Sequence, residues 1–227
     1  MNFLKDVTIT FCPLRIVVAL MGIGACLLFL GTPTKLSPAT AAPRTLTPAE
    51  VALQKEIDVV ESELSERVRG ATVKEVRLIS ETIVKEAHAN RFDPLFVLAI
   101  IEAESNYDTE ACSKTGARGL MQILRSTFKS VSDSPKMFDP VENIKAGVKY
   151  LAQLGTSFKR VESILMAYNG GPGNASAYLR AVQEGWDVEE FSSEMKNYPA
   201  KVMGKYAKLL IKNGRNPKAA RTLYRIP

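Results

Sequence analysis

The chain has few of the residues that build metal centres or thiol catalysts. Its 227 residues include one histidine, His88, and three cysteines, of which Cys12 and Cys26 fall in the apolar N-terminal stretch. Zinc sites need three or four such ligands, so we expect neither a metal nor another cofactor. After loss of the N-terminal stretch only Cys112 remains, which excludes an internal disulfide. A Cys112–His88 catalytic pair is disfavoured because the two residues lie in separate segments.

The chain also lacks the features of a nucleic-acid binder. The formal net charge is +6, and the excess is gathered near the C-terminus, where Lys196 to Arg225 hold nine Lys or Arg and no acidic residue follows Glu194. No aromatic interleaving or nucleic-acid motif accompanies these charges, so no nucleic-acid partner is expected. The basic end is either a surface for an anionic polymer, a membrane or an envelope complex, or an ordinary solvated helix face.

Only one long apolar run is present, and it lies at the N-terminus. Ile16 to Leu30 follows two basic residues, is short for a membrane span, and leads to the small-residue pattern Ala39-Thr40-Ala41. Residues 1–41 are therefore predicted to be an export signal cleaved after Ala41, with the mature protein in the periplasm or at the outer face of the envelope. An uncleaved membrane anchor is the alternative, and a lipoprotein site at Cys26 is a lesser one.

Alternating strand patterns are nearly absent, and apolar residues recur at helical spacing. This favours a mainly α domain of about eight helices. Residues 42–70 are predicted to be a linker and an extra N-terminal helix, which is either packed on the domain or forms a short coiled arm. Residues 71–227 are predicted to be the main domain. Four helix starts carry N-terminal capping signals, three of them with a proline in the first helical position: Thr47-Pro48 with Glu50, Thr72 with Glu75, Asp93-Pro94 and Asp139-Pro140.

The helix that begins at Asp93 is apolar nearly all round and must be buried. Glu104 lies in its last turn, where desolvation and the negative end of the helix dipole both favour the neutral acid. A raised pKa would suit a general acid. The alternative is a buried ion pair of Glu104 with Arg118 or a lysine.

Five segments taken in order resemble the motifs of the soluble lytic transglycosylase domain, which is related to goose-type lysozyme. They are AIIEAESNY, GARGLMQI, DPVENIKAGVKYL, AYNGGPGNA and EMKNYPAKVMGKY, within residues 76–210. The resemblance implies a lysozyme-like helical fold, with residues 71–227 as the catalytic domain. The sequence departs from the family pattern at Met195-Lys196, at Pro199 and near Arg125.

The resemblance also implies the site residues. Glu104 matches the catalytic glutamate, while Glu102, two positions earlier, faces another side of the helix. The GLMQI segment is expected to form the floor of the cleft, as a strand or a loop. Gln122 is expected to form a hydrogen bond with the substrate or with the acid. The substrate-binding residues implied by the motifs are Ser105, Gly119, Met121, Gln122, Tyr168, Asn169, Glu194 and Tyr198.

Glycoside cleavage ordinarily uses two carboxylates, whereas the motifs suggest a single acid. Asp108 is the nearest candidate for a second, but it is expected to bond the loop backbone. The resemblance implies that Glu104 protonates the bridging oxygen and then takes the proton of the sugar's own C6 hydroxyl, which leaves 1,6-anhydromuramic acid ends. The implied partners are peptidoglycan glycan strands, cut at the β-1,4 bond between N-acetylmuramic acid and N-acetylglucosamine. The alternatives are a muramidase with a second carboxylate and water, or an inactive glycan-binding scaffold module of the envelope.

Overall fold

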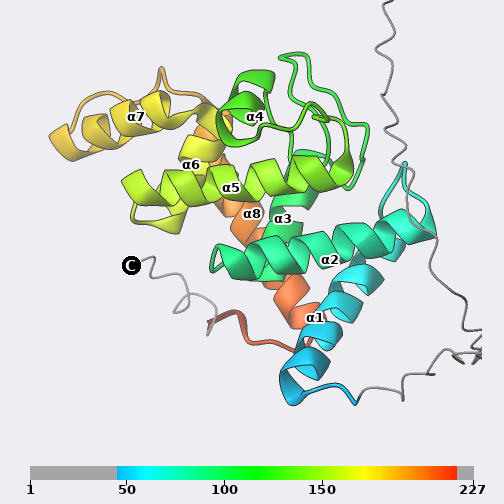
Figure 1. Cartoon of the computed structure of the whole chain (residues 1–227). Coiled ribbons are helices and arrows are strands. Elements are labelled where there is room, and N and C mark those ends of the chain that lie inside the picture. The colour runs from blue at the N-terminus through cyan, green and yellow to red at the C-terminus, as the bar shows by residue number, and fades with distance from the viewer. Residues whose placement is uncertain (1–44, 219–227) are drawn as a thin grey trace, which may run out of the picture. The chain divides into compact units, whose positions relative to one another are not determined.

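The computed structural model describes residues 45–218, and the predicted signal or anchor segment lies outside this range. The described residues form eight helices and no extended strand, which confirms the mainly α prediction. No helix in this range is both long and apolar enough to cross a membrane. The helices are α1 (Pro48–Ser65), α2 (Val73–Ala89), α3 (Pro94–Glu104), α4 (Arg125–Val131), α5 (Pro140–Ser157), α6 (Val161–Gly170), α7 (Pro172–Glu184) and α8 (Ser193–Lys212) (Figure 1).

The predicted helix starts are confirmed by their caps. Thr47 and Thr72 each form a complete capping box with the glutamate three residues later. Asp93 and Asp139 each accept backbone N–H groups of the first turn, and a proline follows each of them in the first helical position. These side chains satisfy donors that a helix cannot satisfy itself, so the starts were readable from local chemistry.

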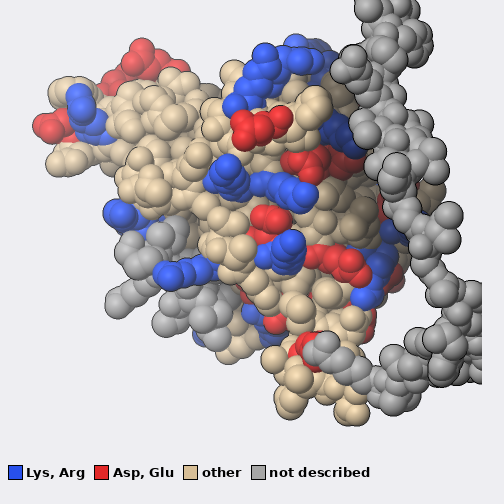
Figure 2. All heavy atoms as spheres, in the orientation of Figure 1, with Lys and Arg blue, Asp and Glu red and all other residues tan. Residues whose placement is uncertain are grey.

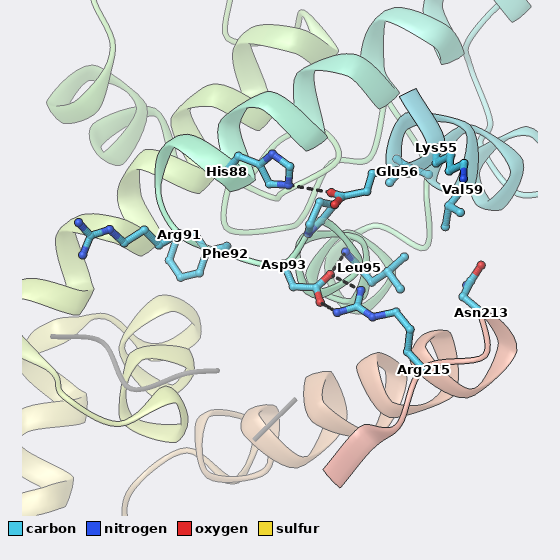
Figure 3. Close-up of a pocket in the computed structure, with 12 residues that line it drawn as sticks. Lys55, Glu56, Val59, His88, Arg91, Phe92, Asp93, Leu95, Asn213 and Arg215 are labelled. Carbon is cyan, nitrogen blue, oxygen red and sulfur yellow. Dashed lines mark hydrogen bonds and ion pairs between the residues drawn. The ribbon is translucent and has the colours of Figure 1, made fainter. Parts of the chain in front are cut away.

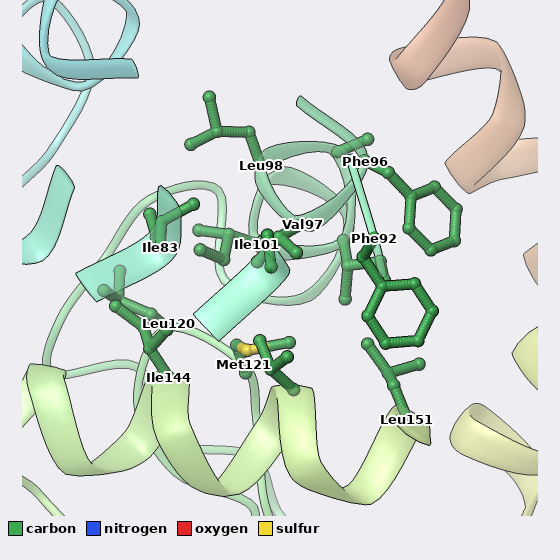
Figure 4. Packing of buried hydrophobic residues seen from close by; sticks show 14 of the residues in the cluster. Ile83, Phe92, Phe96, Val97, Leu98, Ile101, Leu120, Met121, Ile144 and Leu151 are labelled. Carbon is green, nitrogen blue, oxygen red and sulfur yellow. The ribbon is translucent and has the colours of Figure 1, made fainter. Parts of the chain in front are cut away.

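Helix α3 runs through the centre of the domain. Nine of its eleven residues are buried, and it packs on α8, α2 and α1. Figure 4 shows Val97, Leu98 and Ile101 among apolar side chains contributed by three other parts of the chain: Ile83 of α2, Leu120 and Met121 of the loop after α3, and Ile144 and Leu151 of α5. Burial on all sides is what an almost wholly apolar helix requires.

Helix α1 belongs to the same core. Val60 and Leu64 are 1% and 0% exposed, and α1 packs along α2 (Figure 1). Its buried carboxylate, Glu63, pairs with Arg67 at 2.8 Å and with Lys212 of α8 at 3.1 Å. Of the two alternatives for this segment, the structure therefore shows a packed helix.

Most lysines of α8 are bonded within the molecule. Lys205 pairs with Glu102 at 2.7 Å, Lys212 pairs with Glu63, and Lys196 and Lys201 donate to backbone carbonyls. On the face shown in Figure 2, charges of both signs are interspersed over α2 and α5. Two of the five lysines of α8, Lys205 and Lys212, are therefore paired with carboxylates, and Lys208 is exposed.

Candidate active site

Glu104 is the last residue of α3, and its partly buried carboxylate meets α8. The Tyr198 hydroxyl donates to Glu104 Oε1 at 2.5 Å, and Tyr198 itself is 2% exposed. Tyr168 of α6 lines the same cleft as this pair, and its hydroxyl donates to the Met121 carbonyl at 2.8 Å. The tertiary fold thus brings three sequence-distant segments around one acid.

The surroundings of Glu104 favour its neutral form. Burial is the main cause that raises the pKa of Glu104, to about 7, and the charge of Glu194 acts in the same direction. The hydrogen bond from Tyr198 and the charge of Lys201 oppose this rise. Among the described residues Glu104 has no ion-pair partner, and the Arg118 guanidinium lies over the Phe138 ring instead. The ion-pair alternative for Glu104 is thus contradicted.

Glu104 lines a cleft of about 790 Å³. Five other residues that the motifs implied line the same cleft, namely Gln122, Tyr168, Asn169, Glu194 and Tyr198. The remaining walls come from the loop between α3 and α4, from the α6–α7 junction and from α5 and α8, including Lys114, Tyr150, Pro172 and Lys201. A cleft of this size can hold a sugar unit with its neighbours.

Three implied residues lie outside the cleft lining. The Ser105 hydroxyl donates to the Ile101 carbonyl at 3.1 Å, which ends α3. Met121 is fully buried, and its side chain packs against Gly147. Gly119 has φ +72°, and a Cβ there would lie 2.7 Å from Asn143. These residues shape the loop rather than contact the cleft.

Gln122 lines the cleft, but its side-chain amide nitrogen is hydrogen-bonded to the backbone of the loop. Nε2 donates to the carbonyls of Ala111 and Gly119, both at 3.0 Å. The residue has φ +46°, in the left-handed region. Its segment is a turn closed by the paired backbones of Arg118 and Ile123, so of the two expectations for GLMQI it is a loop.

Asn143 is a structural residue that the sequence analysis did not single out. It is 0% exposed on α5; its Oδ1 accepts from Met121 N at 2.9 Å, and its Nδ2 donates to the Arg118 carbonyl at 2.9 Å. In the sequence, Asn143 could have been noticed as a polar residue next to Ile144, which belongs to an apolar helix stripe. Asn143 therefore ties the cleft loop to α5.

The cleft holds a second carboxylate, that of Glu194, which the motifs implied as a substrate-binding residue. Glu194, in the first turn of α8, is exposed, lines the cleft and acts electrostatically on Glu104. Asp108 does not line the cleft: its Oδ1 accepts from Glu110 N at 3.0 Å, and it pairs with Arg69 at 3.5 Å. Glu102 points to another side of α3, where it pairs with Lys205.

A second hollow, of about 550 Å³, lies between α1, the start of α3 and the end of α8 (Figure 3). Its two carboxylates are paired, Glu56 with His88 at 2.7 Å and Asp93 with Arg215. None of the implied site residues lines it. Both carboxylates of this hollow are therefore held by a basic side chain. No group of three or more possible metal ligands occurs within residues 45–218.

A region that contributes most of the cleft lining matches a known protein family. Residues 81–189 match the family model described as the transglycosylase SLT domain. The membrane-bound lytic murein transglycosylase F of Desulfosudis oleivorans is 36% identical over 119 residues, which cover 49% of this chain and 26% of that protein. The chain spans less than half the length of the curated relatives it matches.

Two solved structures share the fold. The lytic transglycosylase Slt of Pseudomonas aeruginosa, solved as an inactive glutamate-to-glutamine mutant, has a TM-score of 0.51 at 26% identity and covers 60% of this chain and 24% of its own. The 70-kDa soluble lytic transglycosylase of Escherichia coli has a TM-score of 0.55 at 20% identity and covers 77% of this chain and 32% of its own. The lysozyme-like, all-helical fold predicted for the domain is thus confirmed.

Proposed function

Because residues 81–189 form a transglycosylase SLT domain, we propose that this chain is a peptidoglycan lytic transglycosylase with Glu104 as its general acid. The observation that carries the proposal is the carboxyl group of Glu104, which lies at the cleft and has a pKa raised to about 7. A group with that pKa holds its proton near neutral pH and still releases it readily. The Slt protein of Pseudomonas aeruginosa that is described as an inactive mutant carries a glutamine in place of one glutamate.

In the first half of the proposed reaction, Glu104 gives its proton to the oxygen that bridges the two sugars. The bond between that oxygen and C1 of N-acetylmuramic acid breaks, and the leaving N-acetylglucosamine keeps the electron pair and the proton. Glu104 is then a carboxylate, which accepts the hydrogen bond from Tyr198. The Tyr198 hydroxyl therefore favours the charged form that this step produces.

In the second half, the C6 hydroxyl of the same muramic residue attacks C1. Glu104 removes the hydroxyl proton and returns to its neutral form, and a 1,6-anhydro ring closes without consumption of water. A retaining hydrolase uses an enzyme carboxylate as the nucleophile. Here the substrate's own alcohol takes that role, so the reaction needs only one carboxylate for acid and base chemistry.

The proposed site of action is the cell envelope. Peptidoglycan lies outside the cytoplasmic membrane, which agrees with the export signal predicted for residues 1–41, and the relative from Desulfosudis oleivorans is named membrane-bound. N-terminal sequencing of the protein recovered from its host separates the alternatives. A chain that starts at Ala42 supports a cleaved signal, and an intact N-terminus supports an anchor.

Glu194 favours a second candidate function, a muramidase on the same fold. As a carboxylate in the same cleft, Glu194 could activate water against C1 while Glu104 protonates the leaving oxygen. The two reactions leave different products, because hydrolysis gives reducing ends and ring closure gives 1,6-anhydro ends.

Mass spectrometry of purified sacculi digested with the protein tests the proposal. We expect anhydromuropeptides from the wild-type protein and a loss of about 10²–10⁴-fold in rate for Glu104→Gln. Glu102→Gln is the matched control, since Glu102 lies on the same helix but is paired with Lys205 outside the cleft, and it should retain activity.

Other products would overturn the proposed reaction. Reducing ends that disappear in Glu194→Gln, but persist in Asp108→Asn, would establish the muramidase. If a folded wild-type protein released no muropeptides at all while it still bound sacculi, the scaffold alternative would hold.

A further inference from the structure

Lys201 approaches the catalytic acid from another helix. It lies on α8, three residues after Tyr198, and its side chain lines the cleft. Its Nζ donates to the carbonyl oxygen of Ala103, the residue before Glu104, at 2.7 Å. The same ammonium lies 6.0 Å from the centre of the Tyr198 ring. Lys201 therefore contacts both the residue before the acid and the ring of the acid's hydrogen-bond donor.

The bond to Ala103 has a clear role at the end of α3. The last carbonyls of a helix have no partner within the helix, and a cation near them is favoured by the helix dipole. Helix α3 has no basic residue in its own last turn. Lys201 supplies that cation from α8 and fixes the turn that carries Glu104.

Lys201 differs from its neighbours on α8 in what it is bonded to. Lys205 and Lys212 are paired with the carboxylates of Glu102 and Glu63. Within the described residues Lys201 has no carboxylate partner at ion-pair distance, so its charge is not neutralised by one. An ammonium group has three donors, and the bond to Ala103 uses one of them.

We propose that Lys201 is a positioning residue for Glu104. Lys201 fixes the last turn of α3, and its positive charge stabilises the carboxylate that forms when Glu104 loses its proton. The inference rests on the proposed function. When the proton moves to the bridging oxygen, negative charge develops on Glu104 in a poorly solvated place. A fixed positive charge nearby lowers the free energy of that charged state. The Glu104 carboxylate can then take the proton of the C6 hydroxyl.

Lys201 is one of several groups that face Glu104 and act on its charge. Glu194 of α8 raises the pKa of Glu104, and Lys201 lowers it together with the hydrogen bond from Tyr198. Tyr168 of α6 also faces Glu104, and burial and the Glu104 charge raise its pKa, so it stays neutral. Lys114 lines the same cleft from the loop before α4.

The test compares Lys201→Met, which keeps an unbranched side chain one atom shorter and removes the charge, with Lys201→Arg. The matched control is Lys208→Met, which removes an equal charge from an exposed position of α8 outside the cleft lining. Two readouts are needed: the titration of the Glu104 carboxyl carbon by NMR in protein labelled with ¹³C-glutamate, and the pH profile of muropeptide release.

We expect Lys201→Met to move the Glu104 titration upward by about 1 pH unit. We also expect muropeptide release at pH 5, where Glu104 is protonated in every variant, to fall by roughly tenfold or more. Lys201→Arg should restore most of the titration and the rate, and Lys208→Met should match the wild-type protein in both.

A Lys201→Met protein that melts earlier but titrates and reacts like the wild-type protein would overturn the proposal and leave Lys201 as a helix cap only. Because the NMR titration needs no turnover, failure of the proposed function would appear separately, as a wild-type protein without muropeptide release. An upward shift of the titration with an unchanged rate at pH 5 would likewise reject the positioning role.

Discussion

The carboxyl group of Glu104 holds its proton more tightly in the folded chain than in an unfolded one. Its pKa is raised from 4.5 to about 7, mainly by burial. The contribution of this group to stability is therefore full below pH 4.5 and is lost as the pH rises through 7. The same desolvation that raises the pKa of Glu104 lowers the stability of the domain in alkaline solution.

Glu104→Gln should stabilise the protein at alkaline pH. Glutamine cannot ionise, and its carbonyl oxygen can still accept the hydrogen bond from Tyr198. At pH 8 we expect the free energy of unfolding to exceed that of the wild-type protein by on the order of 3 kcal/mol, and at pH 4.5 we expect little difference. Urea denaturation at both values measures this, and an equal difference at the two values would contradict it.

Tyr198→Phe should change the pH dependence of the reaction. The Tyr198 hydroxyl lowers the pKa of Glu104, so its loss should raise that pKa further. We expect the pH above which kcat/KM falls to move upward by about one unit, because a hydrogen bond to a charged group contributes roughly 1.5–3 kcal/mol. Tyr178→Phe, on α7 against Phe191, is the control. If the pH above which kcat/KM falls is the same in Tyr198→Phe as in the wild-type protein, this hydrogen bond does not lower the pKa of Glu104.

At the scale of elements, the loop between α3 and α4 is the least regular part of the site and the most dependent on other elements. Its backbone is tied to α5 by Asn143 and to α6 by Tyr168. Three non-glycine residues near it have positive φ, Asn106, Tyr107 and Gln122. Such conformations persist only where the surroundings hold them.

Asn143→Ala should loosen this loop. It leaves the N–H of Met121 and the carbonyl of Arg118 without their buried partner, so we expect a loss of about 2–4 kcal/mol in the free energy of unfolding. The walls of the cleft move with the loop, so kcat/KM should also fall by roughly 10- to 100-fold. Gln153→Ala, which removes an exposed amide on the same helix, should change neither quantity. Guanidinium denaturation and muropeptide release are the measurements.

At the scale of the molecule, α1 is joined to the domain that contains the cleft. Leu64→Ala removes a side chain that is 0% exposed at the contact of α1 with the core, so we expect a loss of about 2–5 kcal/mol. Leu53→Ala is the control on the same helix, 41% exposed, and should stay within about 0.5 kcal/mol. A single cooperative thermal transition is expected for both variants. If Leu64→Ala behaved like Leu53→Ala, α1 would contribute nothing to the stability of the domain.

The sequence by itself determined the helical class and the helix starts, and it led to the proposal of Glu104 as the acid. Capping boxes and Asp-Pro pairs act over three or four residues, and the all-round apolarity of α3 implied its burial, so local chemistry was enough. The resemblance of the motif AESNY to the family predicted Glu104, and not Glu102, as the acid. Asp108 was also correctly expected to bond its own loop.

Only the tertiary structure decided how the neighbouring side chains act on Glu104, and only it placed Lys201, which the motifs had not implied as a site residue, in the cleft. Glu194 and Lys201 lie about ninety residues or more from Glu104 along the chain, and their effect on its charge depends on how α8 packs beside α3. The bonds of Gln122 and Asn143 to the loop backbone depend on the closed conformation of that loop. Electrostatic effects and buried hydrogen bonds depend on distances of a few ångströms between segments, and these distances are set by the packing of the core, which no local pattern specifies.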